Sequence, residues 1–305
     1  MGYKSIQAQC RSGEIPCPPE GSTCPGSRPG VKNVMPGKIR IGLSGWSYKE
    51  WRGSFYPDDL AQGEELAYAA GRFPTLEINR TFYSLVQGKT MQAWYGGTPY
   101  DFRFSVKGSR FITHNKKLAN IEDPMERFVE SGLADLRHKL GPILWQLGPN
   151  LRFDRGRVER FFLGLPRKLG DRSLRHVFEA RHETFFVPEM AQLARQHGVA
   201  LAFSHSSVWP YTEELTAGIV YLRLHGPREV YSSAYSRNEL EQWARRIEKW
   251  ADGSQPEDAR RISDLEPPPR KGRSVYVYFD NDLGGHAPRQ ALELINMLAV
   301  ERTTQ

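Results

Sequence analysis

The sequence has few cysteines and places them all near one end. Cys10, Cys17 and Cys24 are the three in the 305-residue chain, so residues 25–305 contain none. Their seven-residue spacing matches no standard zinc or iron–sulfur pattern, and a chain without cysteine pairs in its main part is typical of a reducing compartment. We therefore expect a cytoplasmic protein with no disulfide framework and no metal bound by these cysteines.

Long apolar runs are also absent. None approaches the roughly 20 residues that a membrane-spanning helix requires, and no early apolar core resembles a secretory signal peptide. The chain contains no phosphate-binding P-loop, no dinucleotide fingerprint and no nucleophile elbow. These absences predict a protein that is not associated with a membrane, and they exclude the commonest nucleotide-binding and serine-hydrolase signatures.

Eight short apolar runs recur along the chain, and each ends abruptly in polar residues. Most intervals between them leave room for one crossover helix and two loops, which parallel strands require. This rhythm predicts a single-domain α/β protein with the TIM (β/α)8 barrel fold, whose working groups lie at the carboxyl ends of the strands. The predicted strands are Ile39–Ser44, Thr75–Ile78, Phe102–Val106, Ile143–Leu147, Val177–Ala180, Ala200–Ser204, Ile219–Leu224 and Val275–Phe279.

Helical patterning fills several of the gaps between these runs. Ser236 and a Glu at the third helical position form a capping-box signature before one of the helices, and Gly198 follows another as a stop signal. The short gap between Ala202 and Leu222 contains Pro210, so we expect only a degenerate helix there. The predicted helices are Gln62–Phe73, Asp123–Leu140, Pro188–His197, Ser236–Asp252 and Pro288–Val300.

The rest of the chain divides into a tail and an insertion. Residues 1–37 are rich in Gly, Pro, Ser and Cys and have no apolar period, so we expect disorder. Met35 lies directly before the first strand and is a candidate natural start, which would place residues 1–34 upstream of the translated protein. Residues 38–302 form the predicted barrel, and residues 253–273 form a polar, Pro-rich insertion in it.

Several blocks of sequence resemble one known family. They are IGLSGWSYKEWRGSFYP (41–57), LEINRTFY (76–83), FRFSVK (102–107), RFITH (110–114), LWQL (144–147), EARH (179–182), YLRLHG (221–226) and FDND (279–282), with Ala287-Pro288 after the last. Over about residues 39–298 the chain is similar to the YecE-like proteins, a domain-of-unknown-function family. The resemblance implies a TIM barrel and no settled activity.

Three places depart from that family pattern, all near strand ends. Arg80 stands where the family more often has a small residue, Ala180 and Phe185 replace bulkier aromatics, and Asp280 stands where an Asn is usual. These changes add a cation and a carboxylate and alter the shape of one wall. Because these changes lie close to the predicted site, we do not carry a ligand of the family over to this chain.

Polar residues alternate with apolar ones at the strand ends, and this parity predicts which side chains face the barrel interior. Apolar neighbours should face the helices, which leaves a polar inward ring. The ring comprises Glu77, Asn79, Glu179, Arg181, Arg223 and His225. Such groups are costly to bury unless they are paired or bound to a ligand. For any one of these residues two interpretations stay open, a ligand site or a closed ion network that only fixes the barrel interior. For the ring as a whole we expect a ligand site, because uncompensated polar groups gathered in one place are poor for stability and this end of the fold carries function.

Aromatic residues follow the first two strands. Trp46, Tyr48 and Trp51 come after the first, and Phe82 and Tyr83 after the second. Together they could form a stacking platform for a sugar, a nucleobase or another flat ligand. The remaining candidate ligand-binding residues at the strand ends are Lys107, His114, Gln146, His182 and Asn281.

The formal net charge is +7, which favours an anionic ligand. One hypothesis is a hydrolase of a phosphodiester or glycosidic bond, in which Glu77, Glu179 and Asp282 act as acid, base or nucleophile and Lys107, Arg181 and Arg223 stabilise negative charge. We assign no cofactor. A variant binds a divalent metal through these carboxylates with His205 and His225. The alternative is a non-catalytic binder of nucleic acid or a phosphorylated metabolite.

Overall fold

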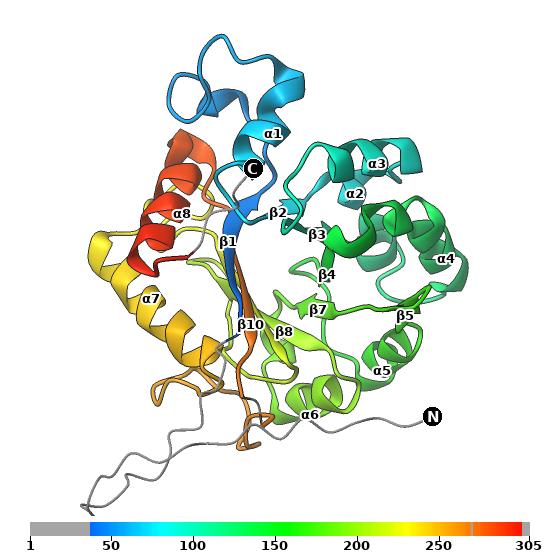
Figure 1. The fold of residues 1–305 in the computed structure, drawn as a ribbon. Helices are drawn as coiled ribbons and strands as arrows, with labels where there is room; N and C mark the ends of the chain where they lie inside the picture. Colours follow the sequence, from blue (N-terminus) through cyan, green and yellow to red (C-terminus); the bar gives the residue numbers. More distant parts are fainter. Residues whose placement is uncertain (1–36, 270, 301–305) are drawn as a thin grey trace, which may run out of the picture. The chain divides into compact units, whose positions relative to one another are not determined.

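The barrel predicted from the sequence is closed in the structure. A computed structural model describes residues 37–269 and 271–300, all within one compact unit, 34–305. Except for Gly37, the predicted tail, its cysteines and Met35 lie outside the described residues. Eight parallel strands pair in the order β1-β10-β9-β8-β7-β4-β3-β2, and β2 closes onto β1 (Figure 1). The fold class predicted from the apolar rhythm is therefore confirmed.

The observed strands follow the predicted runs closely. Three keep the predicted bounds, four shift by one residue at one or both ends, and β4 begins three residues earlier than expected. The barrel strands are β1 Ile39–Ser44, β2 Thr75–Ile78, β3 Arg103–Lys107, β4 Leu140–Gln146, β7 His176–Glu179, β8 Ala200–His205, β9 Ile219–Leu224 and β10 Ser274–Phe279. A small antiparallel pair, β5 Lys168–Leu169 and β6 Arg172–Ser173, lies outside the barrel sheet.

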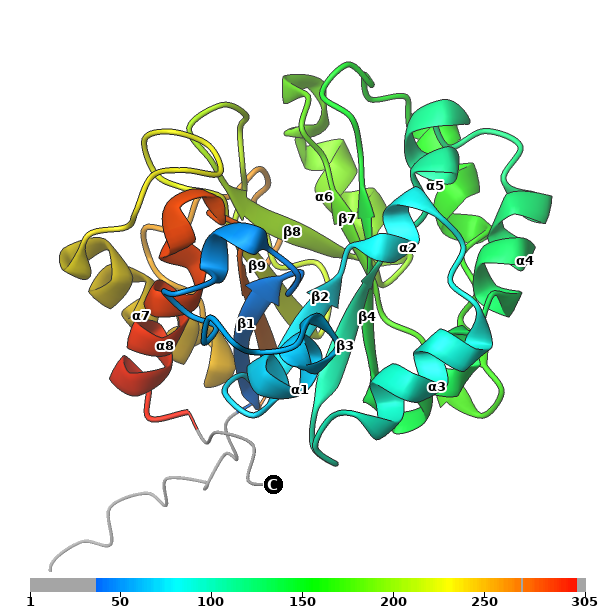
Figure 2. The same cartoon turned by 90° about the horizontal axis from the view of Figure 1, so that it is seen from above.

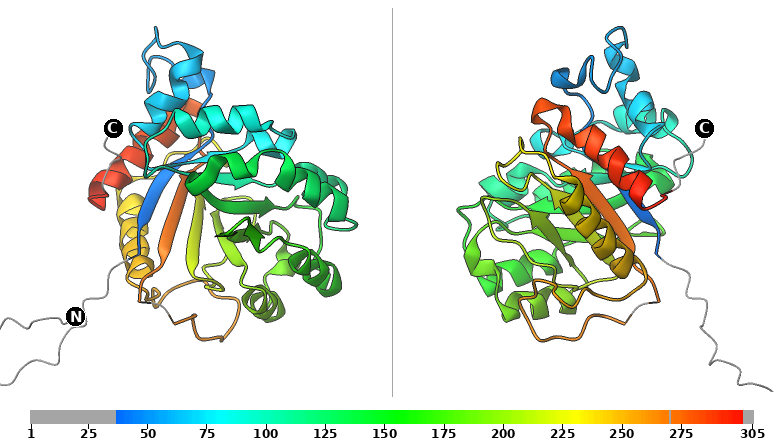
Figure 3. Two further views of the ribbon diagram at one scale, coloured as in Figure 1. Left: turned by 45° about the vertical axis from the view of Figure 1, so that its right-hand side comes forward. Right: turned by 90° about the vertical axis from the view of Figure 1, so that its left-hand side faces the viewer.

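Helices surround the ring of strands, as the view from above shows (Figure 2). In Figure 3, α7 and α8 lie side by side against β10 and β1. The α-helices are α1 Glu65–Ala70, α2 Arg80–Tyr83, α3 Gly88–Gly96, α4 Glu122–Glu130, α5 Arg155–Leu163, α6 Pro188–Gln196, α7 Arg237–Ala251 and α8 His286–Met297. None of the helices in the described residues is long and apolar enough to cross a membrane.

Two predicted helical regions differ from the structure. The single helix expected over Asp123–Leu140 is wrong: α4 ends at Glu130, and a separate 3-10 segment, Leu133–Lys139, follows. Gly132 lies between them with φ of +129°, a conformation that a continuous helix does not contain. Between β8 and β9 there is no helix at all, and residues 253–269 and 271–273 of the insertion contain neither helix nor strand.

The lower barrel interior is filled mainly by apolar and tyrosine side chains. Tyr221, Tyr276 and Tyr278 are buried there among Leu144, Val177 and neighbouring small residues. The Tyr278 hydroxyl lies 2.7 Å from Thr75 Oγ1 and 2.6 Å from Ser105 Oγ, so its polar tip is satisfied. A packed floor of this kind leaves the carboxyl ends of the strands as the open side of the barrel.

Helix α7 begins with the capping box that the sequence predicted. Ser236 Oγ accepts a hydrogen bond from the Glu239 amide, and Glu239 Oε2 accepts one from the Ser236 amide at 2.6 Å.

We expect Ser236→Ala to lower the free energy of unfolding by about 1 kcal/mol. The substitution removes the hydroxyl that accepts the Glu239 amide, and with it one half of the reciprocal pair of hydrogen bonds. Urea unfolding should show this shift, whereas Ser207→Ala, at an exposed loop position, should match the wild type within about 0.5 kcal/mol. Equal midpoints for all three proteins would show that the cap contributes nothing.

Candidate functional site at the carboxyl ends of the strands

One arginine organises the upper barrel interior. Arg223, from β9, is fully buried and reaches three carboxylates from three other strands. Its Nη2 lies 2.8 Å from Glu77 Oε1 and 3.0 Å from Asp280 Oδ2, and its Nη1 lies 3.0 Å from Glu179 Oε2. Arg181 Nε donates to the other oxygen of Glu179 at 2.8 Å. Most of the ring predicted from strand parity therefore meets as one ion network.

The remaining carboxylate positions of this network are also filled. Glu77 accepts hydrogen bonds from Ser44 Oγ at 2.7 Å and from the Tyr221 hydroxyl at 2.6 Å. Asn79 Nδ2 donates to Ser44 Oγ at 3.1 Å, whereas its Oδ1 is buried with no partner in the described residues. Buried ions survive when such additional hydrogen bonds satisfy their lone pairs. Glu77 and Glu179 are thus fixed by their neighbours.

The network favours the ionised forms of Glu179 and Asp280. Burial alone would raise the pKa of Glu179, but Arg181 and Arg223 outweigh it and hold that pKa well below its usual range. Burial also opposes ionisation of Asp280, yet Arg223 and His225 hold the pKa of Asp280 well below its usual range. An ionised carboxylate held in this way is a poor proton donor.

A second chain of polar contacts joins Ser204, His225 and Asp280. His225 Nδ1 lies 2.8 Å from Asp280 Oδ2, and its Nε2 lies 3.0 Å from Ser204 Oγ. Burial and the nearby Arg223 lower the pKa of His225, which favours the neutral ring. The order resembles a serine–histidine–aspartate relay. However, Ser204 is buried and its Oγ accepts the Trp209 indole N–H at 3.1 Å, so we interpret the chain as fixing the His225 ring.

Lys107 stands apart from this network. It ends β3 and is partly buried, and its Nζ has no hydrogen bond or ion pair with any of the residues that the structure describes. The centroid of the Phe82 ring lies 4.5 Å from Nζ. Burial, and then repulsion from Arg223, lower the pKa of Lys107 to about 8. A partly buried ammonium without a paired anion is a ready site for an anionic ligand.

Asp282 is an ionisable group that, like Lys107, has a polar atom without a partner among the described residues. It follows β10, is buried, and its Oδ1 has no hydrogen-bond partner among the described residues. Burial and the charge of Asp280 raise the pKa of Asp282 well above its ordinary value, and the Tyr48 hydroxyl lies beside it. Gly45, with φ of +90°, allows this approach, because an added Cβ there would lie 2.9 Å from the Tyr48 oxygen. Burial and the neighbouring Asp280 therefore favour the protonated form of the Asp282 carboxyl group.

Two neighbouring carboxyl groups at the end of β10 thus have pKa values shifted in opposite directions. Arg223 favours the ionised form of Asp280, whereas burial beside Asp280 favours the protonated form of Asp282. A pair of titratable groups with pKa values pushed apart in this way is typical of sites that perform acid–base chemistry.

The predicted aromatic platform is narrower than expected. Trp51 is fully buried and donates its indole N–H to the Asp282 backbone oxygen at 3.3 Å. In this structure it therefore positions the Asp282 backbone and has no surface for the predicted ligand contact. Phe82 is also buried and packs under Lys107. Tyr83 is 69% exposed. With Trp46, Tyr48, Asn79 and other residues, it lines a pocket of about 570 Å³, here called the β1–β2 pocket.

The other predicted ligand-binding residues are less central. His182 accepts from the Thr184 amide and caps the 3-10 turn Glu183–Phe185. Asn281 Nδ2 donates to Ser233 O and Gln290 Oε1, which ties the end of β10 to α8. Gln146 is buried and donates to the Leu147 oxygen. His114 contacts Phe82 edge-on, and burial and Lys107 lower its pKa.

The metal variant is not favoured by this geometry. Glu77 and Glu179 are occupied by Arg223, and His205 Nδ1 lies 2.8 Å from the Tyr235 hydroxyl, away from the ring. Across residues 37–269 and 271–300, no group of three or more His, Cys, Asp or Glu side chains is arranged to hold a metal ion.

Sequence reasoning missed several members of the site. In β1, Ser44 lies an even number of residues from Arg40, and in β9, Tyr221 lies two residues before Arg223. Each pair therefore points to the same inner side, so strand alternation could have found Ser44 and Tyr221. Ser204 could have been found in the same way. Trp209, whose ring lies 3.9 Å from the Arg181 guanidinium carbon, comes from the loop after β8. No periodicity in the sequence places a loop residue of that kind.

Known proteins show the same architecture. The model of the family described as "Protein of unknown function DUF72" matches residues 40–305. The UPF0759 protein YunF of Bacillus subtilis is 22% identical over 293 residues, which cover 86% of this chain and 95% of that protein. A DUF72 family protein from Thermotoga maritima has a solved structure with a TM-score of 0.70 at 24% identity, covering 86% of this chain and 99% of that one. One from Enterococcus faecalis gives 0.69 at 18% identity, covering 86% and 96%. These structures share the fold.

Proposed function

Because this chain belongs to the DUF72 family, whose description assigns no function, we propose an activity from the site itself: hydrolysis of a phosphodiester bond at the open end of the barrel. The observation that carries the proposal is the pair Lys107 and Asp282. Both are ionisable, both lie at the carboxyl ends of the strands, and each has a polar atom left without a partner among the described residues.

Lys107 supplies the anion-binding part of this proposal. Its ammonium is mostly charged at neutral pH, and the carboxylates nearest to it are already paired with Arg223. A phosphoryl oxygen that approaches Nζ would provide the missing anion and gain from the low dielectric of the site. A neutral glycoside offers no such charge. Moreover, glycosidases use two free carboxyl groups, and Arg223 holds Glu77, Glu179 and Asp280, so that only Asp282 is left open.

Asp282 supplies the proton in this proposal. Water attacks phosphorus, the bond from phosphorus to the leaving oxygen breaks, and the Asp282 proton passes to that oxygen. The attacking water loses a proton to solvent, and solvent reprotonates Asp282. Transition states of phosphoryl transfer are loose, so charge stabilisation by Lys107 and protonation of the leaving group matter more than a strong base.

Turnover on a substrate panel tests the proposal. The full chain would be assayed with bis(p-nitrophenyl) phosphate, thymidine 5′-p-nitrophenyl phosphate and aryl glycosides. We expect hydrolysis of the phosphodiesters and none of the glycosides, with a loss of about 100-fold or more in Lys107→Met. Saturable binding of these phosphodiesters without turnover would instead support the alternative, a non-catalytic binder of phosphorylated ligands.

The pH dependence of hydrolysis should report Lys107. Because its pKa is lowered to about 8, the charge on Nζ disappears at a lower pH than in an ordinary lysine, and the rate should fall as pH rises through about 8. The groups that act on it are Glu77, Glu179, Arg223 and Asp280, with His114 nearby. With thymidine 5′-p-nitrophenyl phosphate, whose leaving group needs no proton from Asp282, the fall should disappear in Lys107→Arg, because the guanidinium keeps its charge. A wild-type rate that is constant to pH 10 would contradict this assignment.

A further inference from the structure

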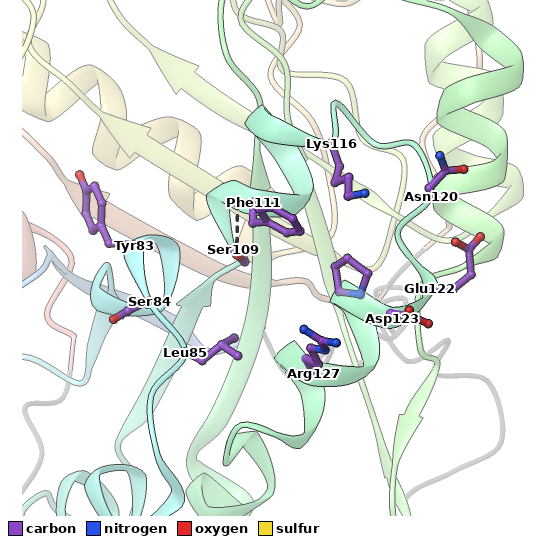
Figure 4. Close-up of a pocket in the computed structure, with 11 residues that line it drawn as sticks. Tyr83, Ser84, Leu85, Ser109, Phe111, Lys116, Asn120, Glu122, Asp123 and Arg127 are labelled. Atoms are coloured by element: carbon purple, nitrogen blue, oxygen red, sulfur yellow. Dashed lines mark hydrogen bonds between the residues drawn. The ribbon is translucent and has the colours of Figure 1, made fainter.

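A second pocket lies beside the open end of the barrel, between α2 and α4. It has a volume of about 540 Å³, within the range of about 300–1,000 Å³ typical of small-molecule sites. We call it the α2–α4 pocket. Its lining residues are Tyr83, Ser84, Leu85, Ser109, Phe111, Lys116, Asn120, Glu122, Asp123, Pro124 and Arg127. Figure 4 shows Phe111 between Tyr83 on one side and Lys116 and Asn120 on the other.

Exposed apolar surface gathers at this pocket. Seven large hydrophobic side chains are exposed among the described residues, and three of them line it: Tyr83, Leu85 and Phe111. Tyr83 is 69% exposed and Phe111 is 49% exposed. Aromatic rings presented to solvent around a hollow are typical of a site that stacks flat ligands.

Charged groups line the same pocket without pairing. Lys116 and Arg127 contribute two cations, and Glu122 and Asp123 contribute two carboxylates. Among the residues that the structure describes, none of these four side chains has a hydrogen bond or ion pair; the ring of Phe111 lies 5.7 Å from Lys116 Nζ. The pocket therefore offers both donors and acceptors for the edge of a polar ring, together with cations for phosphate.

The pocket is linked to Lys107 through two aromatic rings. The Tyr83 ring lies edge-on to Phe82, with ring centroids 5.1 Å apart, and the Phe82 ring lies beneath Lys107. Tyr83 lines both the α2–α4 pocket and the β1–β2 pocket. The exposed Tyr83 ring is therefore one ring away from Lys107 and borders both pockets.

From this arrangement we propose that the α2–α4 pocket is a nucleobase subsite for single-stranded nucleic acid, with one base stacked on Tyr83 or Phe111. The inference rests on the proposed function, because it names the substrate class of the same phosphodiester site. Base–aromatic stacking tolerates any sequence, and cations along the path track the backbone. A duplex keeps its bases stacked on one another, so their faces cannot reach these rings.

Equilibrium binding tests the subsite independently of turnover. Fluorescence anisotropy of a fluorescein-labelled octathymidylate would be measured with the full wild-type chain at low salt. We expect Tyr83→Ala and Phe111→Ala each to weaken binding by about 5- to 150-fold, and Lys116→Ala and Arg127→Ala to reduce the salt dependence. The matched control is Tyr100→Ala, which removes an exposed aromatic ring before β3, at the opposite end of that strand, and should leave affinity unchanged.

The outcomes separate the two proposals. Octathymidylate binding that depends on Tyr83 and Phe111, without hydrolysis of any phosphodiester, would uphold the subsite and overturn the hydrolase. Hydrolysis of bis(p-nitrophenyl) phosphate with octathymidylate binding that is absent, or unchanged in both aromatic variants, would overturn the subsite alone. Tighter binding of a labelled duplex of equal length would also overturn it, because stacked bases cannot use the pocket.

Discussion

Arg223→Met is expected to lower the free energy of unfolding by about 3–5 kcal/mol at neutral pH. Arg223 compensates three carboxylates, and Glu77 and Glu179 are completely buried. Methionine keeps much of the volume but removes the charge and the forked donors. The carboxylates would then be buried without their main partner. Arg181 and His225 could offset only part of the loss, since they contact Glu179 and Asp280 but not Glu77.

The pH dependence of this loss identifies its cause. In the wild type, Glu179 and Asp280 have pKa values below the ordinary range, so the stability that they contribute is present above about pH 4 and is lost as pH falls further. In Arg223→Met the carboxylates can become neutral by taking up protons, so the difference from the wild type should shrink between pH 7 and pH 4. Arg237→Met, at an exposed pair with Glu241, should change stability by less than about 1 kcal/mol. Urea unfolding of the two variants with equal midpoints would contradict the network.

Asp282→Asn is expected to lower the hydrolysis rate of an unactivated phosphodiester by about 10²- to 10⁴-fold. Asparagine has nearly the shape of the protonated carboxyl group and, like it, is neutral, so the fold should be retained. It cannot release a proton to a leaving oxygen. The affinity for a phosphodiester should change little, because Lys107 provides the anion contact.

The leaving group distinguishes a lost proton donor from a general disturbance of the site. An alkoxide needs a proton as it leaves, whereas p-nitrophenolate is stable without one. The Asp282→Asn defect should therefore be large for thymidylyl-thymidine and much smaller for thymidine 5′-p-nitrophenyl phosphate. Asp258→Asn, at an exposed carboxylate in the insertion between α7 and β10, should match the wild type on both substrates. Equal losses on the two substrates would mean that Asp282 has another role.

Much of the fold could be predicted because each barrel strand has a recognisable pattern in the sequence. Each strand is an apolar run of four to seven residues that ends in polar groups, and alternation places Glu77, Glu179 and Arg223 on the inner side. The motif blocks also indicated a family of unknown function, and the match of the DUF72 model over residues 40–305 confirms that coarser statement. The interrupted helix at Gly132 was missed because a positive φ is a local backbone property that apolar spacing does not reveal.

The pairing of charged groups within the site could be predicted less well. Sequence alone showed that carboxylates and cations meet, but it did not show which pairs form. Arg223 contacts three carboxylates, and this leaves Lys107 and Asp282, not Glu77 and Glu179, with unpartnered atoms. Pairing depends on differences of an ångström between side chains from strands that are distant in sequence. The α2–α4 pocket was missed for a similar reason, since its walls come from two separate stretches of the chain, 83–85 and 109–127.

In the proposed reaction, phosphodiesters are cleaved at the open end of this barrel with Lys107 as anion contact and Asp282 as proton donor. Its sharpest test is kcat/KM of the wild type and Asp282→Asn on thymidylyl-thymidine and on thymidine 5′-p-nitrophenyl phosphate, side by side. We expect wild-type turnover of both substrates and a defect in the variant that is at least about 10-fold greater for the alkoxide leaving group. No turnover of either substrate by the wild type, or a variant as active as the wild type on both, would contradict it.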